Sequence, residues 1–343
     1  MIYFLVEYFT EKLRNQISDN VEIADDFAFE QFKVGRSNIT YKIYDDNNVY
    51  VLRRPPFGQK LESAHNMERE FRIISSLYKN NIRVPKPEYI YTDKKISDDD
   101  FYIMEFIEGE TISDNLIAKN FDEIQKKDIT ESFIEALVEI HMFDVVNSKL
   151  STLGKHENYI ERQLVRWSKQ FDAQKVREIN ELNQATKMLF ENIPNQQRVS
   201  IVHGDYRLDN VRVNNSRVKA VVDWELCTLG DPLADLGTII ASWSNKEETD
   251  TPFIYSPSLA GGFPNRNQIL EQYESLSNLS IQDIEFYTRM SFWKHAMIME
   301  GVYVRYSLGY YGDVDNSEIE AFKESTISFA KKASSKNLLG EML

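Results

Sequence analysis

Three polar side chains between Ile201 and Gly237 have the types and the spacing that phosphoryl transfer needs. Asp205 and Asn210 follow a short apolar run, and Asp223 ends a second apolar run further along the chain. Carboxylate and amide oxygens are the hard ligands that Mg²⁺ prefers. Two carboxylates and one amide can therefore hold a magnesium ion and still leave one carboxylate to act as a base.

The residues around these groups predict a strand, a polar turn and a second strand. Apolar and polar residues alternate at 211–213, residues 214–216 are polar, and residues 219–222 are again largely apolar. A hairpin of this kind brings the three groups to one end of itself, although Asp223 is distant from Asp205 in the sequence.

The spacing of these groups resembles the catalytic loop and the metal-binding acid of the protein-kinase-like fold. Two motifs, HGDYRLDN and VVDWE, are similar to those of the aminoglycoside phosphotransferase and choline kinase-like family, because Gly204 stands where protein kinases carry arginine and Trp224 follows the metal-binding acid. A closer resemblance, to the kinase-like domains associated with acyl-CoA dehydrogenases, rests on DWELCTLGDPLADLG, YVLRRPP, SAHNMEREF and GVYVRY. This similarity covers nearly the whole chain.

The resemblance implies an α+β, bilobal, protein-kinase-like fold. Residues 1–105 would form a nucleotide-binding lobe with an N-terminal helix, a small antiparallel sheet and one inward-facing helix. Residues 106–343 would form a mainly helical lobe with the catalytic loop and the substrate pocket. The resemblance also implies ATP, or another nucleoside triphosphate, and Mg²⁺ as cofactors, with Asp205 as the catalytic base and Asn210 and Asp223 as the metal ligands.

The strand predicted at residues 49–53 carries the group expected to bind the α- and β-phosphates. Alternation places Val51 and Arg53 on one face and Arg54 on the other. In the fold that the chain resembles, a lysine occupies the position of Arg53, and the apolar residue two positions earlier lies against the adenine. Arginine presents a planar fork in place of a point charge, so the phosphate geometry can differ. The alternative is that Arg53 and Arg54 are solvated charges at a strand end.

A helix predicted at residues 63–80, with Ser63 as its N-cap, carries an acidic residue on its apolar face. Glu70 lies on this face and Glu68 on the opposite side; the apolar residues of the face are Met67, Phe71, Ile74 and Leu77. A carboxylate on an inward face needs a partner, because burying an unpaired charge is costly. We therefore expect Glu70 to form an ion pair with Arg53. The alternative is a surface salt bridge.

Two further segments are expected to contact the nucleotide. The bend at residues 35–38 would cover the phosphates with backbone N–H groups and a hydroxyl, through Gly35, Ser37 and Asn38. Because it contains a single glycine, an ordinary hairpin turn is the alternative. The resemblance also places the adenine against the connection between the lobes, formed by Met104, Glu105 and Ile107. Here the alternative is a strand that ends in a glycine turn.

Beyond Gly109 the apolar period changes from 2 to 3.6, as expected on entering a helical region. The expected helices cover residues 121–143, 159–193, 239–243 and 282–308. Between the last two, residues 245–266 are rich in Ser, Gly and Pro and form a long irregular segment. Segments of this kind are often lids or binding elements, and the alternative is a disordered insertion.

Several residues near the motifs are expected to have supporting roles. His203 is expected to brace the catalytic loop by a hydrogen bond, and the resemblance implies that Asp231 and Asp235 hold backbone amides. His141 is expected in the core or at a cap. Lys294 and Arg305 lie on one side of the helix at 282–308. We favour a solvated edge for them, with a basic rim for an anionic substrate as the alternative.

Composition limits the classes of partner. The chain has 343 residues and a formal net charge of -14, which argues against nucleic acid because phosphate backbones bind basic surfaces. The single cysteine, Cys227, excludes an internal disulfide and suits a reducing cytoplasm. No stretch is long and apolar enough to span a membrane. The first residues, MIYFLVEYF, lack the basic start of a signal peptide, and their helical spacing from Ile2 to Ile17 predicts a packed amphipathic helix.

These observations predict a small-molecule kinase that phosphorylates a hydroxyl group of a small substrate; they leave the oligomeric state open. The alternative is a nucleotide-binding pseudokinase that serves as a scaffold without turnover, which Arg53 in place of lysine keeps open. Protein kinase activity is a weaker alternative, since no Ala-Pro-Glu segment follows Asp223.

The acceptor is less closely defined by the sequence. An amino sugar would require an acidic pocket, a choline-like amine an aromatic and acidic pocket, and a hydroxyacyl thioester a basic rim with an apolar groove. The resemblance to domains associated with acyl-CoA dehydrogenases favours a hydroxyl on an acyl group or a small organic acid.

Overall fold

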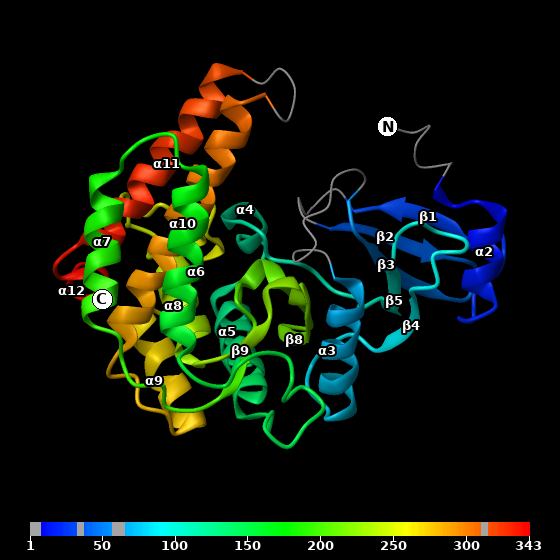
Figure 1. Cartoon of the computed structure of the whole chain (residues 1–343). Coiled ribbons are helices and arrows are strands. Elements are labelled where there is room, and N and C mark those ends of the chain that lie inside the picture. Colours follow the sequence, from blue (N-terminus) through cyan, green and yellow to red (C-terminus); the bar gives the residue numbers. More distant parts are fainter. Residues whose placement is uncertain (1–7, 33–37, 57–65, 310–314) are drawn as a thin grey trace. The chain divides into compact units, whose positions relative to one another are not determined.

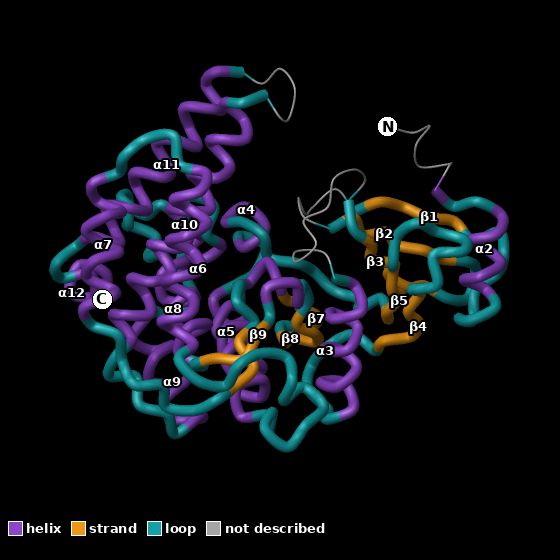
Figure 2. The backbone as a smooth tube through the Cα atoms, viewed as in Figure 1, coloured by secondary structure: helices purple, strands orange, loops and turns teal. Residues whose placement is uncertain are grey.

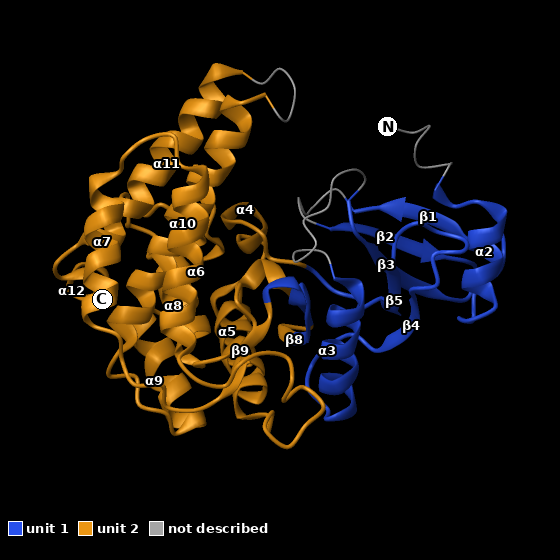
Figure 3. Cartoon of the chain, in the orientation of Figure 1, with its two compact units in different colours: residues 1–110, 212–214, 218–226 blue, residues 111–211, 215–217, 227–343 orange. Residues whose placement is uncertain are grey.

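The computed structural model describes residues 8–32, 38–56, 66–309 and 315–343. The chain divides into two compact units, coloured separately in Figure 3. Unit 1 contains residues 1–110, 212–214 and 218–226, and unit 2 contains residues 111–211, 215–217 and 227–343. The first long segment of unit 1 ends at Glu110, and most of the predicted hairpin belongs to unit 1.

Unit 1 is built on a five-stranded antiparallel sheet with the order β1-β2-β3-β5-β4 (Figures 1 and 2). The strands are β1 (Ala28–Gln31), β2 (Ile39–Tyr44), β3 (Val49–Arg54), β4 (Pro87–Tyr91) and β5 (Phe101–Glu105). Asp45 makes the tight turn between β2 and β3, because its carboxylate accepts hydrogen bonds from the N–H groups of Asn47 and Asn48, at 2.8 and 2.7 Å.

One face of this sheet is covered by α2 (Glu11–Ser18). Phe9, Leu13 and Ile17 are buried against the sheet, as their helical spacing predicts. Thr10 is the N-cap of α2, because its side chain accepts a hydrogen bond from the Leu13 N–H. The earlier part of the predicted helix lies outside the described residues.

The inward-facing helix of unit 1 is α3 (Met67–Lys79). Its N-cap is Asn66, which accepts a hydrogen bond from the Arg69 N–H at 2.8 Å, so the prediction of a start at Ser63 is wrong. Phe71 is only half-buried, because the buried face is turned slightly from the predicted one; the buried residues are Met67, Glu70, Ile73, Ile74 and Leu77. Glu70 lies on this face and Glu68 is exposed, as predicted.

Unit 2 is mainly helical. Its helices are α4 (Asn115–Ala118), α5 (Glu123–Met142), α6 (Tyr159–Gln174), α7 (Asn180–Glu191), α8 (Leu233–Ser242), α9 (Arg266–Ser277), α10 (Ile284–Ser307), α11 (Asn316–Ser334) and α12 (Leu338–Met342). Figure 1 shows α6, α7, α10 and α11 side by side. Helix α10 also packs on α8, which explains why its sequence is apolar on most sides. Each of the four predicted helical regions contains helix, but the region 159–193 is divided into α6 and α7, and the helix expected at 239–243 is α8, which already begins at Leu233.

Two short sheets carry the motifs. Strands β6 (Ser200–Val202) and β9 (Thr228–Gly230) pair antiparallel in unit 2. Strands β7 (Val211–Asn214) and β8 (Arg217–Val221) form the second two-stranded sheet, which is the predicted strand, turn and strand. The α+β class, with an antiparallel sheet in unit 1 and a mainly helical unit 2, is confirmed.

The irregular segment 245–266 is folded and held by side-chain hydrogen bonds. Ser258 Oγ accepts from the Ser244 N–H and donates to the Ser244 carbonyl, at 2.7 and 2.8 Å. Arg266, which is buried, donates to the Ile240 carbonyl and to Glu248. A disordered insertion is therefore excluded, and a role as a lid stays a prediction. Among the described residues, no helix combines the length and the apolar character needed to cross a membrane.

Candidate active site

An ion pair joins β3 to α3 in unit 1, as the sequence predicts. Arg53 Nε lies 3.1 Å from Glu70 Oε2, and the two side chains are 11% and 2% exposed. Tyr102 on β5 donates its hydroxyl to the same carboxylate at 3.1 Å. The alternatives of a solvated Arg53 and a surface salt bridge are thus excluded, because both partners are buried.

Arg53 also contacts two acids that follow β8. It donates to Asp223, and its Nη2 atom lies 3.6 Å from Glu225 Oε2. Asn38 supports this group from the other side, because its amide donates to Glu70 at 3.1 Å and to Glu225 at 3.0 Å. The cluster therefore contains one arginine and three carboxylates, where the sequence predicts a single pair.

The charges of this cluster favour a permanently cationic Arg53. Burial by itself lowers the pKa of Arg53, but the negative charges of Glu70 and Asp223 outweigh burial and raise that pKa above its ordinary value. Burial raises the pKa of Glu70, whereas Arg53 and the Tyr102 hydroxyl favour its ionised form. A fixed cation beside β3 is suited to phosphate oxygens.

Asp223 projects from an unusual backbone conformation. Its φ of 67° lies in the left-handed region, which aspartate tolerates better than most residues with a side chain. The chain then enters a short 3₁₀ turn, Trp224–Leu226, and the Trp224 indole donates to the Val221 carbonyl at 3.0 Å. The turn fixes the Asp223 carboxylate at the end of β8, where it is 34% exposed.

The predicted adenine contacts lie at the end of the unit 1 sheet. Val51 and Met104 are paired across β3 and β5 and are both nearly buried. The Glu105 N–H donates to the Lys86 carbonyl at 2.8 Å, so this N–H already has a partner. The Ile107 carbonyl accepts from Arg212 at 3.3 Å. The Glu105 N–H is therefore already used within unit 1.

The residues after Ile107 are held by β7, a contact that the sequence does not predict. Arg212 donates to the Gly109 carbonyl, and Glu110 pairs with Val213 as an isolated β-bridge. Gly109 has a φ of 136°, and a Cβ atom there would lie 2.3 Å from the Val213 carbonyl oxygen. Glycine is therefore required at this position. Gly35 and Ser37, which are predicted to bind phosphate, lie outside the described residues.

In unit 2, a buried aspartate holds the loop that was predicted to be catalytic. Asp235 on α8 accepts from the N–H groups of His203 and Gly204, at 2.7 and 2.8 Å. His141 bridges Asp235 and the Tyr273 hydroxyl, at 3.2 and 2.8 Å, and is itself buried. The predictions for Asp235 and His141 are confirmed. Asp231 likewise accepts from backbone amides, those of Leu233 and Gln197.

The loop places Asp205 and Asn210 in contact. The Asn210 amide donates to the Asp205 carboxylate at 3.1 Å and to the Asp205 carbonyl at 2.8 Å. Both hydrogen bonds use the amide nitrogen of Asn210. The amide oxygen, which is the atom that can bind a cation, takes no part in them. His203 Nδ1 accepts the Asp205 N–H at 3.3 Å, which confirms its predicted role as a brace.

Side chains that can carry a positive charge lie near Asp205. Arg207 Nε lies 3.3 Å from Asp205 Oδ1, and Arg207 also donates to Asp209 at 2.7 Å. Burial would raise the pKa of Asp205, but Arg207, His295 and Lys294 outweigh burial and hold that pKa below its usual value. Asp205 is therefore ionised at neutral pH, as a base has to be.

Lys294 and Arg305 on α10 were predicted to have the same environment, but the structure gives them different ones. The Lys294 ammonium is half-buried and donates to the Gly204 carbonyl at 2.7 Å, so the solvated edge that the sequence favours is wrong for Lys294. Arg305 is exposed near the end of the helix. Its distance from the catalytic loop along α10 explains the difference.

Arg54, also predicted as a solvated charge, is 1% exposed. It forms a buried ion pair with Asp99, and its guanidinium lies 4.1 Å from the centre of the Tyr8 ring. The burial of Arg54 could have been inferred from the alternation of β3, because this alternation places Arg54 on the face of the sheet that α2 covers. The identity of the partner depends on a loop 45 residues away.

Each unit contributes a side chain of a type that Mg²⁺ binds. In unit 1, Asp223 offers an accessible carboxylate, and in unit 2, Asn210 offers an amide oxygen. Within the described ranges, no three His, Cys, Asp or Glu side chains gather in a way that could hold a metal ion by themselves. Mg²⁺ in kinase sites is typically held by one or two carboxylates together with phosphates and water, so the residues fit this cation.

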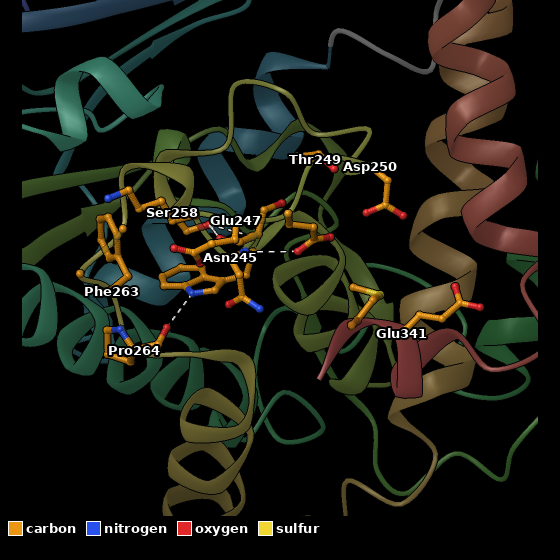
Figure 4. Close-up of a pocket in the computed structure, with 15 residues that line it drawn as sticks. Asn245, Glu247, Thr249, Asp250, Ser258, Phe263, Pro264 and Glu341 are labelled. Atoms are coloured by element: carbon orange, nitrogen blue, oxygen red, sulfur yellow. Dashed lines mark hydrogen bonds between the residues drawn. The ribbon is translucent and has the colours of Figure 1, made fainter.

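A pocket that the sequence does not predict lies in unit 2 (Figure 4). Its volume is about 570 Å³, and it is lined by residues 243–250, Ser258, residues 261–264 and residues 341–342. The irregular segment therefore provides most of its wall. Acidic side chains outnumber basic ones in this wall; the charged residues are Lys246, Glu247, Glu248, Asp250 and Glu341.

Curated proteins similar to this chain are longer than it. Acyl-CoA dehydrogenase family member 11 of Homo sapiens is 30% identical over 299 residues, which cover 85% of this chain and 37% of that protein. Acyl-CoA dehydrogenase family member 10 of Mus musculus is 34% identical over 291 residues, which cover 80% of this chain and 26% of that protein. The chain thus matches only a minor part of each relative's length.

Solved structures share the fold. A putative aminoglycoside phosphotransferase from Ralstonia eutropha JMP134 superposes with a TM-score of 0.79 at 29% identity, covering 94% of this chain and 97% of that one. An aminoglycoside phosphotransferase in a ternary complex with ADP and hygromycin B gives a TM-score of 0.61 at 14% identity, covering 95% and 99%. At 14% identity the likeness shows the fold alone.

The sequence profile described as "Phosphotransferase enzyme family" matches residues 28–267. This range contains β3, α3, the catalytic loop and the β7–β8 hairpin, and it is more than half of the chain. Because the match extends over the elements that carry Arg53, Asp205 and Asp223, we conclude that the chain belongs to the phosphotransferase enzyme family.

Proposed function

We propose that this protein transfers the γ-phosphoryl group of ATP, or of another nucleoside triphosphate, to a hydroxyl group of a small molecule. The observation that carries the proposal is the contact between Asp205 and Asn210 on a loop whose backbone is held by Asp235. The loop presents an ionised carboxylate beside an amide group whose oxygen can bind a metal ion. Such a transfer needs a base and metal ligands of this kind.

The nucleotide contacts are assigned to unit 1. Val51 and Met104 would lie against the adenine, and backbone groups near Glu105 and Ile107 would bind its polar edge. Arg53, oriented by Glu70, would neutralise phosphate charge, with help from the bend at Gly35, Ser37 and Asn38. A fixed guanidinium costs no reorganisation when charge shifts during the transfer.

Asp223 and Asn210 are the proposed ligands of Mg²⁺. A Mg²⁺ ion held by these residues would supply positive charge to neutralise the phosphate oxygens. Arg53 is bonded to Asp223 in the structure, so it would have to share or release this carboxylate when a cation binds.

Asp205 is the proposed base. It would orient the acceptor hydroxyl and accept its proton while the hydroxyl oxygen forms a bond to the γ-phosphorus and the bond to the diphosphate breaks. Positioning and charge stabilisation would supply most of the rate in such a transfer.

A scaffold that binds a nucleotide without turnover is the second candidate function. The observation that favours it is the contact of Arg53 with Asp223, which would have to open before the carboxylate is free for a metal ion. If it stays closed, the chain could bind a nucleotide and remain inactive.

The acceptor that we propose is a hydroxyl on an acyl group or a small organic acid. Its support is the similarity to relatives named acyl-CoA dehydrogenase family members, of which the chain spans only a part. A second class, a cationic amine such as an amino sugar, is favoured by the excess of acidic side chains in the wall of the unit 2 pocket. Two of these acids, Glu248 and Asp250, are already paired with Arg266 and Lys332, so Glu247 and Glu341 carry this argument.

One experiment tests these alternatives together. Purified protein is incubated with Mg-ATP and a panel of amino sugars, choline-like amines, hydroxy acids and hydroxyacyl-CoA esters, and ADP release is measured. Acceptor-dependent ADP release by one class supports the kinase and names the acceptor. If every class is inert while calorimetry shows tight Mg-ATP binding, the scaffold function is supported. If neither turnover nor nucleotide binding is detected, both proposals are wrong.

A further inference from the structure

The peptide groups on both sides of Gly204 are held by separate side chains. The N–H of Gly204 donates to Asp235 on α8 at 2.8 Å, and its carbonyl accepts from Lys294 on α10 at 2.7 Å. Gly204 itself has a φ of 88°, which a residue with a side chain rarely adopts. Its conformation therefore depends on what holds the two adjoining peptides, and the second of these peptides leads directly into Asp205.

Burying the charged Lys294 ammonium costs free energy unless nearby groups stabilise its charge. Burial lowers the pKa of Lys294, because removing an ammonium from water disfavours its charge. Asp205 and Asp235 oppose that effect, and the ammonium lies 5.6 Å from the centre of the Trp167 ring, within the range of a cation–π contact. A charged donor held among these groups makes a stronger hydrogen bond to a carbonyl than a neutral one.

We propose that Lys294 is a positioning residue, which orients Asp205 by holding the peptide between Gly204 and Asp205 from α10. This inference rests on the proposed phosphotransferase function. It gives α10 a role in the loop itself, since Lys294 binds the loop backbone. It also replaces the alternative in which Lys294 forms a basic rim for an anionic substrate.

The expected effect is on turnover. A displacement of a reacting group by a fraction of an ångström to 1 Å can lower the rate by about 10- to 100-fold, so we expect a loss of this size when the hydrogen bond is removed. Affinity for Mg-ATP should stay within about twofold, because the change leaves the nucleotide groups in place.

Three variants of the full chain test this role. Lys294→Met keeps most of the aliphatic stem and removes the donor. Lys294→Arg keeps a cationic donor and should restore much of the turnover. Arg305→Met removes an exposed cation from the same helix and should behave as the wild type. Turnover is measured with the acceptor found in the screen and, separately, as hydrolysis of ATP with water as the acceptor; Mg-ATP binding is measured by calorimetry.

Three results would overturn the inference. The first is wild-type turnover in Lys294→Met. The second is an equal loss in Lys294→Met and Lys294→Arg, and the third is a loss that appears only in the KM of the acceptor, which would assign Lys294 to acceptor binding. If Lys294→Met does not fold, Lys294→Gln, which is shorter and neutral, replaces it in the same comparison.

Amide hydrogen exchange separates this inference from the proposed function. If Lys294 holds the loop, peptides that cover residues 203–207 should exchange faster in Lys294→Met than in the wild type, and Lys294→Arg should restore protection. Unchanged exchange contradicts the inference even in a protein without turnover. Conversely, a wild type that lacks both turnover and Mg-ATP binding contradicts the proposed function, whatever the exchange data show for the loop.

Discussion

Arg53 and Glu70 form a buried ion pair between β3 and α3, with 3.1 Å between Nε and Oε2. Glu70 also accepts hydrogen bonds from Asn38 and Tyr102, so its carboxylate is fixed from several sides. Orientation of this kind leaves the rest of the guanidinium to face other groups, such as Asp223 in this structure and, in our proposal, phosphate oxygens.

The pair predicts energetic coupling in nucleotide binding. In a double-mutant cycle, Arg53→Ala and Glu70→Ala should show a coupling free energy for Mg-ATP affinity of at least about 1 kcal/mol, because each residue contributes only when its partner is present. Calorimetry on the two single variants and the double variant measures this coupling. Glu68→Ala, on the exposed side of α3, is the matched control and should leave affinity unchanged. Additive effects of the two main substitutions would remove Glu70 from the nucleotide site.

Arg53 and its neighbour Arg54 should differ in what they affect. Arg54→Met leaves Asp99 buried without its partner, so it should lower the free energy of unfolding by about 3 to 5 kcal/mol, the usual range for breaking a buried pair. If it is purified folded, its Mg-ATP affinity should equal that of the wild type. Arg53→Met should instead weaken Mg-ATP binding. Chemical denaturation and calorimetry on both variants provide the comparison, and loss of nucleotide binding in folded Arg54→Met would contradict the assignment.

The two central acids should separate metal binding from proton transfer. Asp223→Asn removes a charged oxygen ligand and should weaken Mg²⁺-dependent ATP binding. Asp205→Asn should leave Mg-ATP affinity nearly intact while turnover falls by about 10²- to 10⁴-fold, the usual range for a positioned base. Both variants are nearly isosteric, so melting temperature serves as the control for folding. The opposite pattern, with binding lost in Asp205→Asn and retained with turnover in Asp223→Asn, would reverse the two roles.

His295 should make the folded state sensitive to acid. Burial, with Arg207 nearby, lowers the pKa of His295 to about 4, and its ring lies against Phe253 and Phe329. Between that value and the ordinary pKa of about 6.5, the unfolded chain binds a proton that the folded chain does not, so stability falls as the pH is lowered. Over this window the wild type should lose on the order of 2 to 3 kcal/mol that His295→Gln does not lose.

Urea denaturation at several pH values between 7.5 and 4 tests the prediction for His295. The quantity compared is the pH dependence of the free energy of unfolding in the wild type and in His295→Gln, so a constant loss from altered packing does not matter. His156→Gln, at a histidine elsewhere in the chain, serves as the control for a substitution of this type. Parallel curves for the wild type and His295→Gln would show that His295 titrates normally.

The sequence by itself determined the elements and motifs of this protein. Helical periodicity placed Glu70 on the inward face of α3, and strand alternation placed Arg53 and Arg54 on opposite faces of β3. Both properties are local, because they depend only on the geometry of one element. The spacing of Asp205 and Asn210 within one short loop is local as well, and the structure shows these two side chains in contact.

Only the tertiary structure decided which groups these side chains meet. Arg53 contacts Asp223, which lies 170 residues away in the sequence. Arg54 contacts Asp99, 45 residues away, and Lys294 contacts Gly204, 90 residues away. Periodicity predicts which face a side chain occupies, but it contains no information about which distant segment packs against that face. From the sequence alone, Lys294 was therefore expected at a solvated edge of its helix. It reaches the Gly204 carbonyl because α10 packs beside α8, and this packing is a property of the tertiary structure.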